Sequence, residues 1–140
     1  TFFNATFFKG KGLQTTIARV EILDASNKSF ENIEDVRAWA NSPEALGDEF
    51  ADREMIIREE VDRSMGFPCL RYDGESETTS PKFPGKVFDH DARGYYCLHP
   101  KGNDYIAHIG CSRRTPKGQP HIAGAEECES FINKLMLTSF

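Results

Sequence analysis

Two stretches near the start of the chain have the hydrophobic pattern of paired β-strands. Residues 1–8 are rich in phenylalanine, and residues 15–23 are β-branched and partly alternating between apolar and polar side chains. A run of lysines and glycines at residues 9–12 separates the two stretches. Alternation with a period of two is typical of strands, and glycine suits the turn between them. The pattern therefore predicts an N-terminal β-hairpin.

Apolar residues then recur at helical spacing from Phe30 to Ala40. Asn32 is suited to cap the start of this helix, and Asp35 stands three residues later, where a capping partner is expected. A second helical turn is predicted at residues 42–44, where serine, proline and glutamate follow one another. The two signals predict a helical region after the hairpin.

Strands are predicted again further along the chain. Residues 53–62 and 69–75 are two such segments, and a hairpin follows, with strands at residues 94–100 and 105–112. Residues 76–85 contain serine, threonine and two prolines, and we expect a loop there. These segments add three or four strands to the N-terminal pair.

An amphipathic helix is predicted near the C-terminus. Cys128, Phe131, Ile132 and Leu135 follow at i, i+3, i+4 and i+7, which places them on one face. Runs of strands with segregated helices indicate an α+β fold, an antiparallel sheet with helices packed on it. The length of 140 residues predicts a single domain over residues 1–140.

The order of these elements resembles that of the PsbP-like superfamily. The resemblance includes the turn at residues 66–68 (Gly-Phe-Pro), the strand ending in Gly-Cys-Ser-Arg-Arg at residues 110–114, and the closing Glu-Ser-Phe-Ile-Asn-Lys-Leu at residues 129–135. That superfamily includes photosystem extrinsic subunits, a Ran-binding nuclear import factor and bacterial envelope lipoproteins. The resemblance implies an αβα sandwich and a non-enzymatic accessory or binding role, with no catalytic residues to carry over.

The net charge and the hydropathy of the chain argue against two classes of partner, nucleic acids and the membrane interior. The formal net charge is −5, whereas proteins that bind nucleic acid normally carry a basic excess. No apolar run approaches the roughly 20 residues that a membrane helix needs. We therefore expect no nucleic-acid partner and no membrane-spanning segment. Any signal peptide or lipid anchor would lie upstream of Thr1, and a cell-envelope or secreted location is favoured over the cytoplasm.

The cysteines leave two alternatives open. They are Cys69, Cys97, Cys111 and Cys128. Buried thiols are one alternative, and one or two disulfides formed in an oxidising compartment are the other. If the hairpin turn spans residues 101–104, Cys97 faces His108, and Cys97 and Cys111 point to opposite faces of the sheet. A bridge between Cys69 and Cys97 is then the more plausible pairing.

Candidate catalytic and metal-binding sets are sparse. The chain has no nucleophile elbow and no phosphate-binding loop. A small enzyme using Cys97 and His108 as a nucleophile pair is an alternative function, because a histidine can activate a neighbouring thiol. A metal-binding module is a second alternative function. Its four metal ligands would be Cys97, His99, His108 and Cys111. Strand geometry puts His108 and Cys111 on opposite faces, which argues against that site.

The leading hypothesis is a non-enzymatic accessory or binding module without a cofactor. It would act through a protein partner or a small ligand. The candidate binding residues are the local basic group Arg113, Arg114 and Lys117, together with His99 near the hairpin turn. Guanidinium and ammonium groups can bind an anion or an acidic protein surface.

Overall fold

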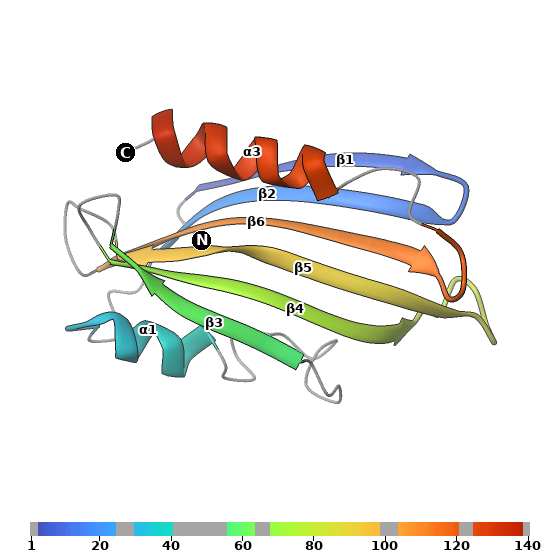
Figure 1. The fold of residues 1–140 in the computed structure, drawn as a ribbon, viewed down its shortest axis with the longest axis horizontal. Helices are drawn as coiled ribbons and strands as arrows, with labels where there is room; N and C mark the ends of the chain where they lie inside the picture. The colour runs from blue at the N-terminus through green and yellow to red at the C-terminus, as the bar shows by residue number, and fades with distance from the viewer. Residues whose placement is uncertain are drawn as a thin grey trace.

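A six-stranded antiparallel sheet forms the body of the protein in the computed structural model (Figure 1). The structure describes residues 3–24, 30–40, 56–63, 68–98, 104–120 and 125–138. The strands are β1 (Phe3–Lys11), β2 (Gln14–Asp24), β3 (Ile56–Asp62), β4 (Cys69–Thr79), β5 (Val87–Leu98) and β6 (Tyr105–Pro116). Their order across the sheet is β1-β2-β6-β5-β4-β3, so β1 and β3 are its two edges.

The predicted N-terminal hairpin is confirmed, with longer strands and a tighter turn than the sequence suggested. Lys11 pairs with Gln14, so only Gly12 and Leu13 lie in the turn. Gly12 has a φ of 62°, which a two-residue hairpin turn requires at this position and which glycine adopts without steric cost. The lysines of the run at residues 9–12 therefore belong to β1.

Helix α1 (Ile33–Ala40) covers one face of the sheet at one end. The predicted cap is confirmed: the Oδ1 atom of Asn32 accepts hydrogen bonds from the backbone N–H groups of Glu34 and Asp35, at 3.0 and 3.1 Å. The carboxylate of Asp35 accepts in return from the N–H of Asn32. The buried side chains of this layer are Phe30, Ile33, Val36, Ala40, Leu70, Leu98 and Ile106. The second predicted helical turn lies outside the described residues.

Helix α3 (Ala125–Thr138) lies on the opposite face of the sheet from α1 (Figure 1). Two residues of its predicted apolar stripe, Cys128 and Ile132, are buried against the sheet, and Phe131 is partly buried beside them. Strand side chains beneath the helix are Cys69, Cys97, Ala107, Ile109 and Cys111. The helix therefore closes a second, separate apolar layer.

The predicted α+β sandwich is wrong. The described residues form a β-rich fold, a single six-stranded sheet with only two short helices. Residues 76–79, expected in a loop, extend β4 and pair with residues 87–90 of β5. Thr78 and Phe88 face each other there and both are buried. A strand with one buried face needs apolar residues only at alternate positions, so the polar composition of this stretch concealed its strand.

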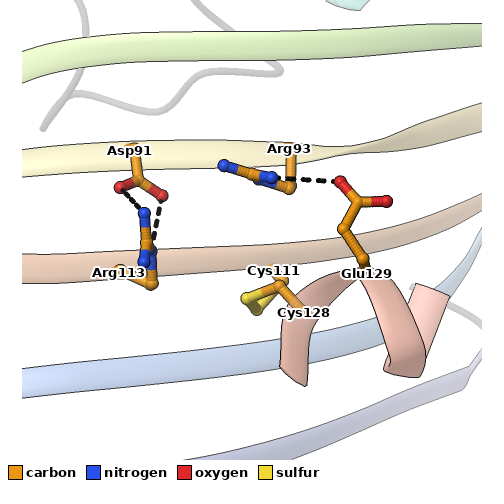
Figure 2. Close-up of a disulfide and its surroundings, with 6 residues drawn as sticks. All are labelled: Asp91, Arg93, Cys111, Arg113, Cys128 and Glu129. Atoms are coloured by element: carbon orange, nitrogen blue, oxygen red, sulfur yellow. Dashed lines mark hydrogen bonds and ion pairs between the residues drawn. A yellow bond between two sulfur atoms is a disulfide. The ribbon is translucent and has the colours of Figure 1, made fainter. Parts of the chain in front are cut away.

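Two disulfides join all four cysteines. Cys69 and Cys97 stand directly opposite each other on β4 and β5, with Cα atoms 4.1 Å apart. Cys111 of β6 bonds to Cys128 of α3 and ties the helix to the sheet (Figure 2). Of the two alternatives left open for the cysteines, the structure has the disulfides, and the pairing of Cys69 with Cys97 is the one considered more plausible.

The predicted register of the β5–β6 hairpin is wrong by one residue. Cys97 pairs with Ala107, and Tyr96 pairs with His108. A shift of one residue moves a side chain to the other face of a sheet. Cys97 and Cys111 consequently share the face beneath α3, whereas His108 lies on the opposite face.

Candidate functional site

The predicted basic group is divided between the two faces of the sheet. Arg113 points to the α3 face and makes two hydrogen bonds to Asp91, with Nε–Oδ1 and NH2–Oδ2 distances of 3.0 and 2.6 Å (Figure 2). Both side chains are about nine-tenths buried, at 11% and 12% exposure. A bidentate pair at this depth satisfies both groups, so Arg113 does not offer its charge to a partner.

The other predicted binding residues lie apart from Arg113. Arg114 is on the opposite face, with its guanidinium carbon 4.9 Å from the centroid of the Phe88 ring. Lys117 is exposed and forms an ion pair with Glu77. His99 lies outside the described residues. The structure therefore brings none of the three described basic residues together into one anion-binding surface.

The alternative Cys97–His108 nucleophile pair is not assembled. Cys97 is bonded to Cys69 and its strand position faces α3, whereas His108 faces the other side of the sheet. The same separation divides the donor set considered for a metal. Among the described residues, no group of three histidine, cysteine, aspartate or glutamate side chains lies close enough to hold a metal ion.

A row of polar side chains that the sequence did not reveal crosses the α1 face of the sheet. The Tyr72 hydroxyl lies 2.8 Å from Nε2 of His108, and Nδ1 of His108 lies 2.8 Å from a carboxylate oxygen of Glu21. The ring of Tyr96 stacks on His108, with centroids 4.2 Å apart. This row links β4, β5, β6 and β2 side by side.

Hydrogen bonding and burial shift the pKa values of the carboxyl group and the two phenols of this row. The hydrogen bond from His108 lowers the pKa of Glu21, against the opposing effect of burial. Burial raises the pKa of Tyr72 well above its usual value and that of Tyr96 to about 12. Both phenols therefore stay protonated at neutral pH, and the Tyr72 hydroxyl, the His108 ring and the Glu21 carboxylate are hydrogen-bonded to one another within the sheet face.

Two glycines make room for the row. A Cβ atom on Gly110 would lie 2.6 Å from the Tyr72 hydroxyl, and one on Gly94 would lie 2.8 Å from the same hydroxyl. Glycines inside strands often mark such close approaches. They were the one sequence signal for the row, and the wrong register concealed which histidine and tyrosine they served.

Among the residues that the structure describes, the largest exposed apolar side chains belong to the edge strand β1. Phe7 and Phe8 have 58% and 69% of their surface exposed. Phe7 points to the α3 face, where its ring meets Phe131 edge-on with centroids 5.8 Å apart. Phe8, the next residue along the strand, points to the α1 face. The edge of the sheet thus presents an aromatic ring on each face.

A cleft lies between β1 and α3. It has a volume of about 200 Å³. Its lining residues are Phe7, Phe8, Lys9, Thr16, Ala18, Cys111, Glu127, Cys128 and Phe131. Lys9 of β1 and Glu127 of α3 form an ion pair at 2.8 Å, with both side chains more than half exposed. The β1 edge therefore combines exposed apolar side chains with a neighbouring cleft.

No protein-family model, curated protein or solved structure matches the chain. The resemblance to the PsbP-like superfamily therefore stays a prediction. In the part of the chain that the structure describes, neither helix is long and apolar enough to cross a membrane.

Proposed function

We propose that this chain is a binding module that takes up an extended segment of a partner protein as an additional strand at the edge of β1. The observation that carries the proposal is the exposure of Phe7 and Phe8 on opposite faces of a nine-residue edge strand. An edge strand presents unpaired backbone N–H and C=O groups, which supply the hydrogen bonds of strand addition. Exposed aromatic rings beside those groups supply apolar contact area.

The opposite edge of the sheet, strand β3, is rich in charged residues. Strand β3 carries four charged residues in seven positions, Arg58, Glu59, Glu60 and Asp62. Charges of this kind are the usual means by which an edge strand is kept from pairing with other chains. The contrast supports β1 as the edge that is used for binding.

The rest of the fold would hold this edge in a fixed geometry. Strand β2 pairs with β1 along its whole length, and the disulfide between Cys111 and Cys128 holds α3 beside it. A preformed edge binds with a smaller loss of conformational entropy than a flexible segment does. Structural disulfides are typical of proteins that fold in an oxidising compartment, which supports a cell-envelope or secreted location for this module.

Photo-crosslinking from two positions tests the proposal. A photoreactive phenylalanine at Phe8 should capture the partner from a native extract, and the same residue at Val87, exposed on β5, should not. Sequencing the cross-linked peptide should identify an extended, apolar segment. Phe7→Ser in the Phe8-labelled protein should reduce capture about tenfold or more. Equal capture from both positions, or capture that Phe7→Ser leaves unchanged, would refute the edge as the binding site.

A further inference from the structure

We infer that the segment bound at β1 runs antiparallel to it, as every strand pair of this sheet does, and carries an acidic residue followed directly by two apolar residues. This inference rests on the proposed function and specifies its partner. It follows from the order of side chains along the edge: Phe7 on the α3 face, Phe8 on the α1 face, and Lys9 on the α3 face again.

The charge of β1 favours an acidic partner. Residues 3–11 contain two lysines, Lys9 and Lys11, and no acidic residue. Lys9 already pairs with Glu127, but its side chain is 68% exposed and that of Glu127 is 53% exposed. An ion pair between such exposed groups is weak, so a carboxylate on an added strand can share the ammonium group. A basic residue at the same place would meet like charge.

The same reasoning argues against a second copy of this chain as the occupant. Two β1 strands paired antiparallel about Phe7 would place Lys9 opposite Ala5 and Lys11 opposite Phe3. Neither lysine would then find a carboxylate across the new pair of strands. A partner with its own acidic residue matches this edge better than β1 matches itself.

The direction of the chain fixes the order of the motif. In an antiparallel pair, the partner residue opposite Lys9 precedes those opposite Phe8 and Phe7. Side chains directly opposite each other lie about 5 Å apart and interact. The partner sequence is therefore aspartate or glutamate, then an apolar residue against Phe8, then an apolar residue against Phe7.

The second apolar residue would stand beside the cleft. Phe7 and Phe131 both line it, and so does the disulfide between Cys111 and Cys128. A space of about 200 Å³ is large enough for a branched aliphatic side chain such as leucine. The cleft thus favours a medium-sized apolar residue at this position, while the position against Phe8 faces open surface.

Two synthetic peptides test the motif. One is Thr-Thr-Thr-Glu-Val-Leu-Thr-Thr-Thr, and the other has lysine in place of the glutamate. NMR titration of the full chain should give about fivefold tighter binding of the glutamate peptide at low salt, and less discrimination at high salt. Lys9→Gln should abolish the preference and Lys9→Glu should reverse it. Lys82→Glu, the same charge change in the β4–β5 turn, should leave it intact.

The outcomes separate this inference from the proposed function. If neither peptide binds, if both bind equally, or if Lys9→Glu leaves the preference unchanged, the acidic motif is refuted. Selective cross-linking from Phe8 in the same protein would then still support strand addition with a different partner sequence. If the glutamate peptide is not preferred and cross-linking from Phe8 is not selective, both proposals are refuted.

Discussion

Phe7 of the edge strand and Phe131 of helix α3 pack edge to face, with ring centroids 5.8 Å apart. The contact joins the first strand of the sheet to the last helix of the chain. Both rings also line the cleft at the proposed binding edge. This pair therefore links the stability of the fold to the surface that is proposed to bind.

Replacing either ring should show that the two act together. Aromatic pairs of this geometry contribute about 0.5–1.5 kcal/mol beyond the area that they bury. A double-mutant cycle with Phe7→Ala and Phe131→Ala, measured by urea unfolding, should return a coupling energy in that range. Phe8→Ala is the matched control, since this ring points to the other face, and its coupling to Phe131→Ala should be close to zero. Equal coupling for both phenylalanines would contradict the contact.

The disulfide between Cys111 and Cys128 should stabilise the fold and also hold α3 in place. Replacing both cysteines by serine should lower the free energy of unfolding by about 3 kcal/mol, from loop-closure entropy alone. The Cys69→Ser and Cys97→Ser pair should cost a similar amount, because its loop is also of moderate length. The two variants should differ in hydrogen exchange, measured by mass spectrometry. Only loss of the Cys111–Cys128 bridge should speed exchange selectively in α3.

Gly110 should tolerate no side chain. Its Cβ would lie 2.6 Å from the Tyr72 hydroxyl and 2.8 Å from Nε2 of His108. Gly110→Ala should therefore destabilise the protein by about 2 kcal/mol, as overpacking in a filled interior does. Gly10→Ala, whose Cβ would meet the exposed ring of Phe8 at 3.2 Å, is the control and should cost less than about 1 kcal/mol.

Tyr72→Phe tests whether a steric clash with the Tyr72 hydroxyl causes the destabilisation in Gly110→Ala. It removes the hydroxyl that the new methyl group would strike, so it should recover part of the stability lost in Gly110→Ala. If the two substitutions are simply additive in thermal unfolding, the steric explanation is wrong.

Glu21 should make the protein acid-sensitive. The hydrogen bond from His108 lowers the pKa of its carboxyl group below the ordinary value of 4.5. A folded-state pKa below the unfolded one contributes stability that is present above about pH 4.5 and is lost as the pH falls through the folded-state pKa. Glu21→Gln should remove this part of the pH dependence in urea unfolding at pH 2–6. Tyr72→Phe should lower stability without changing that slope, because the pair of Glu21 and His108 remains.

Local signals in the sequence predicted the elements with clear periodicity or caps. The N-terminal hairpin, the cap of α1 by Asn32 and the buried stripe of α3 at Cys128 and Ile132 all follow from patterns within one continuous segment of the chain. These features depend on interactions between near neighbours in the chain, which a sequence displays directly.

Features that depend on strand register were not predicted correctly from the sequence. The β5–β6 connection is one residue out of phase with the predicted turn, and that single step exchanged the faces of Cys97 and His108. It hid both the shared face of Cys97 and Cys111 and the contact of His108 with Tyr72. The prediction of one shared basic surface was wrong for a related reason. Consecutive residues of a strand, such as Arg113 and Arg114, point to opposite faces of the sheet.

The proposed binding edge was not predicted from the sequence, because it depends on where the strand lies in the sheet. The phenylalanines of residues 1–8 were assigned to a strand, but only the order of strands in the sheet shows that this strand is an edge. An aromatic side chain in a central strand is usually buried in the core, whereas the same side chain in an edge strand can be exposed for binding.

Amide hydrogen exchange of β1, measured by NMR before and after addition of the partner segment, tests strand addition most directly. The alternate N–H groups of β1 that face away from β2 should exchange fast in the free protein and should become strongly protected in the complex. The amides of β3, at the other edge, should not change. A complex that forms while the outward amides of β1 keep exchanging at their free rate would show that the partner binds elsewhere.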